Sequence, residues 1–320
     1  LGILNKIESH GVFPIAEDNS RAISEVWELA SSPWGWENYR SADDDTEICT
    51  DLLPSLVNSG WAECVSTWGA LTALAKSPDV TLNKLALISR PRPDGSMKHR
   101  LIRDLRRSGV NDFVHQGERI TLPRPFDLAQ DALDLGQHLK SGEEFWFFGM
   151  DVSDAFHQIP LRRDEWKFTA ISFGDKFYIF KVLVFGSGSA PTVWGRYAAW
   201  LGRSTLMLAD RSRLRAEIYV DDPAYVIRGT APQAAVEISV AICLAMAAGF
   251  PWAWRKSEGG HFLKWIGVTY EVTTSPEVSV IVGIPDDKVA AAINFCSSSL
   301  EKNYIHAKAL REGAGLIQFI

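Results

Sequence analysis

The chain has 320 residues, of which 33 are Lys or Arg and 39 are Asp or Glu, so its formal charge is −6 at pH 7. Hydrophobic residues make up 46% and charged residues 22% of the sequence, which excludes a disordered chain, a collagen-like repeat and a small disulfide-stabilised protein. The net charge excludes no partner, because a local basic groove acts over about one Debye length. The four cysteines form no CxxC pair, and their spacing predicts neither a zinc site nor a disulfide framework.

The sequence shows no pattern typical of a signal peptide or a transmembrane helix. The most apolar stretch, residues 238–250, is shorter than the ~20 residues that cross a bilayer and is interpreted as a buried helix. The chain starts at Leu1 without a signal-peptide pattern and ends on an apolar, uncapped segment. We therefore expect an internal piece of a longer polypeptide that acts inside the cell, in the cytoplasm or nucleus, without contact with a membrane.

The first eighty residues predict a helical extension, with apolar residues at helical spacing in 22–30 and 61–75. A turn rich in Pro and Gly at 91–95 then separates two runs typical of strands, 85–88 and 99–105, which predicts a hairpin with basic flanks. The later elements, in chain order, are a helix at 126–139, a central strand at 145–150, a strand at 177–185, a helix at 192–208, two strands at 216–220 and 224–227, a helix at 234–248 and a strand or hairpin at 264–272. This order predicts an α+β fold with an antiparallel sheet that has helices on one face.

Three carboxylates stand where predicted strands end. Asp151 follows the apolar run 145–150, and Asp221 and Asp222 lie at the tip of the hairpin 216–227. If these strands are neighbours in one sheet, the three acids converge, and like charges so close require a raised pKa or a cation. Oxygen ligands favour Mg²⁺ first and Mn²⁺ second, and two such ions would serve nucleotidyl transfer. The alternative is that Asp221 and Asp222 are ordinary turn residues.

Two segments resemble signature motifs of the reverse transcriptases of retroviruses and retrotransposons. One is Asp-Val-Ser-Asp-Ala-Phe at 151–156, followed by Gln-Ile-Pro-Leu at 158–161, and the other is Tyr-Val-Asp-Asp at 219–222. The tetrapeptide arises by chance in a chain of this length at roughly 10⁻³ to 10⁻². The resemblance implies a right-hand polymerase with an antiparallel palm sheet backed by helices, in which Asp151, Asp221 and Asp222 hold two Mg²⁺ ions.

The segment 98–111 resembles the family's fingers motif R-x-x-x-D-x-R-x-x-N, with one or two extra residues before Asn111. The resemblance implies that Arg100 holds the triphosphate of the incoming nucleotide, for which a guanidinium is suited. A further fingers cation would be Arg90, Arg92 or Lys98, and the alternative is a solvated basic loop. We expect a basic groove along this segment, made of Arg90, Arg92, Lys98, Arg100, Arg103, Arg106 and Arg107.

The segment 185–191 resembles the family's stretch along the nascent base pair. Gly186 and the Ser-Ala-Pro ending match, whereas Phe185 replaces the Gln that is common there, and a strand-to-helix turn explains the small residues about as well. Phe156 corresponds to the bulky residue that abuts the nucleotide sugar and excludes a 2′-hydroxyl. The alternative for Phe156 is a place in the core.

Three later positions complete the resemblance. Lys256 resembles a lysine near the active site that can protonate the leaving pyrophosphate, and its alternative is an exposed surface lysine. The turn at 264–267 resembles the primer grip, so Trp265 and Gly267, with Tyr219, are expected to face primer or template. Core packing of Trp265 is the alternative.

The function predicted from this resemblance is that of an RNA-directed DNA polymerase from a retroelement. Its partners are an RNA or DNA template with primer, deoxynucleoside triphosphates and the rest of a parent polyprotein. The expected domains are the helical extension at 1–80, fingers and palm at 81–284 and the start of a thumb at 285–320. The alternatives are a decayed or truncated remnant that binds nucleic acid without catalysis, and an RNA polymerase with the same palm.

Overall fold

The computed structural model describes residues 37–92, 95–114, 118–302 and 304–319. They form two compact units, and each unit is assembled from several stretches of the chain. The first contains the described residues up to Thr121, together with Asp154–Ala198 and Ala247–Phe250. The second contains Leu122–Ser153, Ala199–Met246 and the described residues from Pro251 onward. The chain therefore crosses between the units more than once, in agreement with a fold specified by long-range contacts.

The first unit is built on two small antiparallel β structures. The strands β2 and β3 form a hairpin, which confirms the one predicted from the turn at 91–95, and β1 pairs with β6 in the order β1-β6-β5. The elements of this unit are α2 (Arg40–Asp43), α3 (Thr46–Asn58), β1 (Ala62–Val65), α4 (Trp68–Ala75), β2 (Lys84–Pro91), β3 (Met97–Asp104), η2 (Val110–Phe113), η3 (Ala155–Gln158), η4 (Arg163–Phe168), β5 (Ile171–Phe173), β6 (Lys176–Phe180) and the first half of α6 (Ala190–Leu208).

The N-terminal region differs from its predicted pattern. Residues 61–75 are not one helix, since β1 pairs with β6 and α4 begins only after Thr67, whose hydroxyl accepts a hydrogen bond from the Ala70 N–H at 3.2 Å. Pairing with a strand more than 100 residues away decides the conformation of 62–65 against the local helical spacing. The helix α3, which contains Pro54, was not predicted, and the helix predicted at 22–30 lies outside the described residues.

The second unit contains a four-stranded antiparallel sheet in the order β7-β8-β4-β9 and a second sheet in the order β10-β11-β12. The predicted central strand and the predicted hairpin at 216–227 are confirmed, because β4 lies between β8 and β9 and β7 pairs with β8. The elements of this unit are α5 (Pro125–Gly136), β4 (Glu144–Gly149), the second half of α6, β7 (Leu214–Tyr219), β8 (Asp222–Gly229), α7 (Ala231–Ala248, up to Met246), η5 (Trp254–Lys256), β9 (Glu258–Gly260), β10 (Phe262–Trp265), β11 (Val268–Thr273), β12 (Ser279–Gly283), α8 (Asp286–Leu300) and α9 (Ala307–Phe319).

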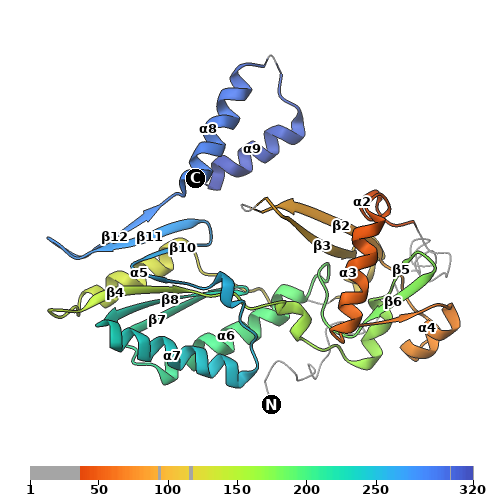
Figure 1. Ribbon diagram of the computed structural model, residues 1–320, viewed down its shortest axis with the longest axis horizontal. Coiled ribbons are helices and arrows are strands. Elements are labelled where there is room, and N and C mark those ends of the chain that lie inside the picture. Colours follow the sequence, from red (N-terminus) through yellow and green to blue (C-terminus); the bar gives the residue numbers. More distant parts are fainter. Residues whose placement is uncertain (1–36, 93–94, 115–117, 303, 320) are drawn as a thin grey trace. The chain divides into compact units, whose positions relative to one another are not determined.

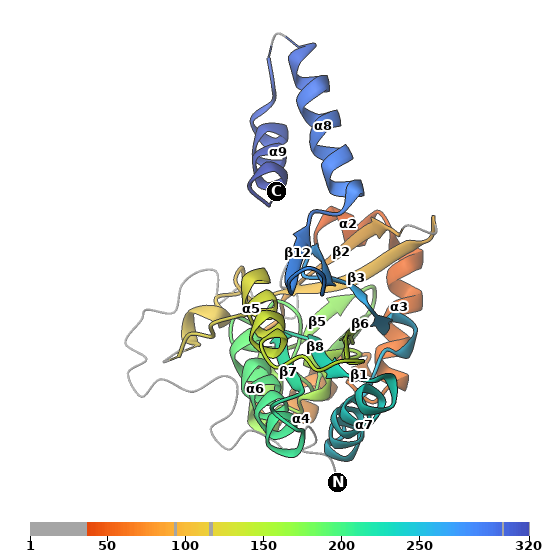
Figure 2. The ribbon, with the colours of Figure 1, turned by 90° about the vertical axis from the view of Figure 1, so that its left-hand side faces the viewer.

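Helices cover both faces of the four-stranded sheet, rather than the single face that the element order predicts. Figures 1 and 2 show α5 on one side of the sheet, with α7 on the other. On the α5 side, Leu128 and Ala132 pack in one core with Phe145, Phe147 and the second sheet. In the apolar run 145–150, Phe145 and Phe147 are buried on one face, and Trp146 and Phe148 on the other face are half-buried. The helices α8 and α9 lie side by side in both views.

The helix α7 is the one described helix that is long and apolar enough to cross a membrane by length and composition, with a mean hydropathy of 1.6 over 18 residues. Its buried residues Ala234, Ile238, Ala241 and Ala245 recur at helical spacing and form one face. A core helix passes the same test of length and composition. The predicted helix is confirmed, but only one face of it is buried, since Val236 and Met246 are exposed on its surface.

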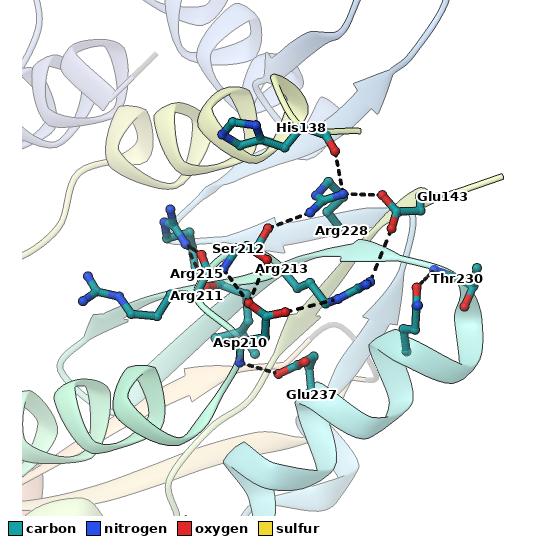
Figure 3. A network of polar contacts seen from close by, with 12 residues as sticks. His138, Glu143, Asp210, Arg211, Ser212, Arg213, Arg215, Arg228, Thr230 and Glu237 are labelled. Carbon is teal, nitrogen blue, oxygen red and sulfur yellow. Dashed lines mark hydrogen bonds and ion pairs between the residues drawn. The ribbon is translucent and has the colours of Figure 1, made fainter. Parts of the chain in front are cut away.

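A buried ion-pair network closes the end of the sheet far from the hairpin tip (Figure 3). Arg228 is 3% exposed, and its guanidinium donates to a Glu143 carboxylate oxygen, to the His138 carbonyl at 2.6 Å and to the Ser212 carbonyl at 3.0 Å. Arg213 approaches the other Glu143 oxygen at 3.3 Å. Burial acts to raise the pKa of Glu143, but the Lys140 N–H and the charges of both arginines outweigh it and hold the pKa below its usual range. The Glu143 carboxylate therefore joins its own loop to Arg213, just before β7, and to Arg228 of β8.

A pair of carboxyl groups connects α5 to β7. Burial raises the pKa of Glu217 to about 7, assisted by the charges of Asp131 and Asp127 and by a side-chain hydrogen bond with Asp131. Burial likewise raises the pKa of Asp131 to about 6, although Arg215, 3.9 Å away, opposes the shift. Near neutral pH the two groups therefore share a proton, which Glu217 donates to Asp131.

This pair predicts a pH-dependent stability that Glu217→Gln removes. The folded pKa of Glu217 is raised above its unfolded value near 4.3, so its stabilising effect is present at pH 4 and is lost as pH rises through about 7. The amide of the variant carries no charge to titrate. We expect Glu217→Gln to melt at a higher temperature than the wild type at pH 8, with a smaller difference at pH 5.5, in thermal unfolding followed by circular dichroism. An equal difference at both pH values would contradict the shared proton.

Candidate active site

Asp151 and Asp222 lie side by side because the pairing of β4 with β8 continues beyond the last residue of β4. The N–H groups of the two neighbours of Asp151 donate to the carbonyls of Pro223 and Asp221, at 2.9 and 2.8 Å. This register carries Asp151 alongside Asp222, the first residue of β8. Two carboxylates from segments 71 residues apart thus meet at one end of the sheet.

The two carboxyl groups are close enough for the charge of one to act on the other. Burial raises the pKa of Asp222, and the charges of Asp221 and Asp151 and a side-chain hydrogen bond with Asp151 raise it further, while Lys256 opposes the shift. The Lys256 ammonium forms an ion pair with an Asp151 carboxylate oxygen. Among the described residues, no three His, Cys, Asp or Glu side chains are arranged to hold one metal ion. Asp151 and Asp222 are therefore paired, and Asp221 acts on Asp222 through its charge.

The two-residue turn that joins β7 to β8 is strained. Tyr219 pairs directly with Asp222, so Val220 and Asp221 form a two-residue turn, in which Val220 has a positive φ of 55°. A β-branched residue rarely adopts this conformation, at a cost of about 1–3 kcal/mol. Tyr219, at the end of β7, is 36% exposed. The strain is stored at the tip that presents the acids, as is typical of functional sites.

The turn predicted as a primer grip is confirmed as a hairpin between β10 and β11. Ile266 and Gly267 both have positive φ, 38° and 85°, and the Gly267 carbonyl accepts a hydrogen bond from the Lys288 ammonium at 3.1 Å. Trp265 is 4% exposed and belongs to the core beside α5, while its indole N–H donates to the Asp222 carbonyl at 2.9 Å. Trp265 is thus a core residue that also fixes the backbone at Asp222.

A second group of predicted site residues meets in the first unit. The Phe156 and Phe185 rings lie 5.1 Å apart, and the Arg100 guanidinium lies 5.8 Å from the centre of the Phe185 ring. Arg100 is exposed on β3, and both rings are half-buried. The structure therefore brings Arg100 and Phe156 together through Phe185, the residue that departs from the family pattern.

The local structure requires a glycine at position 186. Its φ is +106°, and a Cβ at this position would lie 1.8 Å from the Arg103 carbonyl oxygen. The Asn111 side chain secures the same loop, since it donates to the Gly186 carbonyl and accepts from the Gly188 N–H, both at 2.9 Å. The last residue of the fingers motif therefore acts by fixing the loop 186–188 against β3.

One expected member of the basic groove is buried. Arg103 is 1% exposed, its guanidinium lies 3.9 Å from the centre of the Phe180 ring, and burial lowers its pKa to about 9. Beside it His157 is 7% exposed, and its pKa is lowered to about 3 by burial and by the charge of Arg103. Alternation along β3 points Arg103 inward and Arg100 outward. Arg103 is therefore removed from the predicted groove, and neither burial was predicted from the sequence.

Comparison with known proteins decides the family. The family model described as "Reverse transcriptase (RNA-dependent DNA polymerase)" matches residues 88–270, more than half of the chain. The chain belongs to the reverse transcriptase family. The match contains both carboxylate segments, the fingers hairpin from Ile88 onward, the loop at Gly186 and the turn at Gly267. No curated protein sequence matches the chain.

Solved structures of foamy viral reverse transcriptases share the fold. The foamy viral protease-reverse transcriptase dRH in complex with double-stranded DNA is 17% identical, with a TM-score of 0.62, over 91% of this chain and 43% of that one. The foamy viral protease-reverse transcriptase in complex with an RNA/DNA hybrid is 16% identical, with a TM-score of 0.59, over 89% of this chain and 32% of that one. The chain therefore spans less than half the length of these reverse transcriptases, and the similarity shows the fold.

Proposed function

We propose that this chain is the fingers and palm part of an RNA-directed DNA polymerase that extends a primer with deoxynucleotides. The observation that carries the proposal is the pairing of Asp151 with Asp222 at the end of β4 and β8, at the positions that match the family's two carboxylate motifs. Residues 81–284 are assigned to fingers and palm, and 285–320 to the start of a thumb. The foamy viral structures, which contain double-stranded DNA or an RNA/DNA hybrid, support nucleic-acid partners.

The carboxylates fit the divalent ions that this activity requires. The charges of Asp221 and Asp151 both act on Asp222, and this repulsion favours a bound cation at the site. Carboxylate oxygens are the ligands that Mg²⁺ and Mn²⁺ prefer. Asp151, Asp221 and Asp222 would hold two such ions. When bound, the ions supply activation of the primer 3′-hydroxyl and neutralisation of the triphosphate and pyrophosphate charge.

The protein's own residues position the reactants. The Trp265 indole and the pairing of β4 with β8 fix the backbone at the two carboxylates, so their geometry exists before substrate binds. Gly267 and the exposed Tyr219 are assigned to the primer end and template, whereas the buried Trp265 supports the site from the core rather than facing primer. Lys256, which forms an ion pair with Asp151, is assigned to the leaving phosphate.

The residues of the first unit are assigned to the incoming nucleotide. Arg100 is exposed and free of burial cost, so its guanidinium can bind a triphosphate with two parallel hydrogen bonds. Phe156 would contact the sugar and reject a 2′-hydroxyl, while Gly186 allows the loop to approach closely. A polymerase of this kind works on templates and deoxynucleotides inside the cell, as one part of a longer polyprotein.

Primer extension tests the proposal. On a poly(rA) template with an oligo(dT) primer and Mg²⁺ or Mn²⁺, we expect extension with dTTP, none with UTP, and a loss of about 100-fold or more in Asp222→Asn. Asp154→Asn is the matched control, because Asp154 is an exposed carboxylate three residues after Asp151 with a positive φ of 49°, which Asn tolerates.

The outcomes separate the alternatives. Extension with UTP would identify an RNA polymerase. Salt-sensitive binding of the primer-template without extension would identify a nucleic-acid-binding remnant. An equal loss in Asp154→Asn and Asp222→Asn would show that the carboxylate pair has no special role.

A further inference from the structure

The segment that carries Lys256 is tied by its backbone to the strand end that carries Asp151. The Ser153 N–H donates to the Pro251 carbonyl at 2.8 Å, and the Ala253 N–H donates to the Asp151 carbonyl at 2.9 Å. The Lys256 N–H then closes the short η5 turn on the Ala253 carbonyl at 2.8 Å. Lys256 is therefore placed by short, local connections rather than by a mobile loop.

The Lys256 ammonium lies beside the carboxylates of Asp151 and Asp222. It forms an ion pair with Oδ1 of Asp151, and its charge also acts on Asp222. The Asp151 side chain is 14% exposed, whereas the lysine side chain is 55% exposed. The carboxylate is thus fixed and mostly buried, and the cation reaches it from solvent on a flexible stem.

A bound divalent ion and this ammonium compete for the same oxygen. Mg²⁺ binds carboxylate oxygens at about 2.0–2.1 Å, and its charge repels an ammonium group hydrogen-bonded to Oδ1. Without metal, however, three carboxylates at one site repel each other, and a neighbouring cation reduces that repulsion. A half-exposed lysine can leave at little cost, since ion pairs open to solvent contribute little to stability.

We infer that Lys256 is a placeholder cation, which neutralises Asp151 in the metal-free protein and is displaced when a divalent ion binds. This inference rests on the metal site of the proposed function and assigns to Lys256 a role before substrate binds. A lysine that served only as a proton donor to pyrophosphate would leave metal affinity unchanged. The placeholder role instead predicts competition between the ammonium and the metal.

Binding of Mn²⁺ to the full chain, without nucleic acid, tests this competition. The free Mn²⁺ signal in electron paramagnetic resonance reports the bound fraction directly, so no catalytic activity is needed. We expect Lys256→Met to bind Mn²⁺ about 3- to 5-fold more tightly than the wild type, which is the affinity change that loss of such an ion pair produces. Lys256→Arg retains a cation and is expected to bind at the wild-type affinity.

Arg255→Met is the matched control, because it removes the same charge one residue away. We expect it to change Mn²⁺ affinity by less than about 1.5-fold, since an exposed charge acts weakly through water. Equal tightening in Arg255→Met and Lys256→Met, or unchanged affinity in Lys256→Met, overturns the placeholder role but not the proposed polymerase function, which primer extension by the wild-type chain tests separately. Absence of Mn²⁺ binding in every variant overturns both the placeholder role and the metal site. Where Mn²⁺ does bind, loss of binding in Asp222→Asn identifies the carboxylates as its site.

Discussion

Gly186→Ala is expected to destabilise the first unit by about 3–5 kcal/mol, which lowers its melting temperature by roughly 10 °C. Two costs add at this position. A φ of +106° is strained for any residue with a Cβ, and the new Cβ would overlap the Arg103 carbonyl oxygen at 1.8 Å. The overlap involves backbone on both sides, so no side-chain rotation relieves it. The loop must move and give up its two hydrogen bonds with Asn111.

Gly174→Ala separates the two costs, because Gly174 also has a positive φ, +57°, but has no atom within 4 Å of an added Cβ. We expect Gly174→Ala to lose only ~1–2 kcal/mol, the conformational cost alone. Thermal unfolding followed by circular dichroism measures both variants. A melting temperature for Gly186→Ala no lower than that of Gly174→Ala would show that the loop accommodates a side chain and that Arg103 does not confine it.

Glu143→Ala is expected to cost about 3–5 kcal/mol, because it leaves a buried cation without its carboxylate. Arg228 is almost completely buried, and it would retain only the two backbone carbonyls of His138 and Ser212. Arg213 would lose the same partner at 3.3 Å. The expected decrease in melting temperature is about 10 °C, measured by the same thermal unfolding.

Two further variants identify the cause of this loss. The double variant Glu143→Leu with Arg228→Leu is expected to recover part of the stability, since it leaves no unpaired charge at the buried position. Asp287→Ala is the control for an exposed ion pair, because Asp287 meets Lys264 at 3.2 Å with a 70% exposed side chain, and its expected cost is below about 1 kcal/mol. A loss in Glu143→Ala as small as that in Asp287→Ala would show that the network is solvated.

The family and the carboxylate pairing could be predicted from the sequence for a local reason. The acids lie in segments whose patterns identify their conformation: an apolar run before Asp151, and two short β-rich runs around Asp221 and Asp222. A strand-turn-strand pattern fixes which residues stand at the tip, so Asp222 was expected in the turn of the hairpin, whereas the structure makes it the first residue of β8. The untested roles of Arg100, Phe156 and Gly267 toward substrate remain predictions.

Contacts between distant segments were beyond the reach of these patterns. Residues 62–65 form a strand only because β6 pairs with them, and α5 and α7 lie on opposite faces of the four-stranded sheet. No local feature distinguishes the buried Arg103 from the exposed Arg100, since only the register of β3 against its surroundings decides which arginine points inward.

The sequence by itself determined the family, the order of the main strands and helices and the positions of the three acids, since each depends on spacing along a short segment. The tertiary structure alone decided that Lys256 meets Asp151 across 105 residues, that Asn111 holds the loop at Gly186 and that Glu143 pairs with Arg228. Such pairings depend on backbone register and burial, to which every packed element contributes, and no single stretch of sequence contains that information.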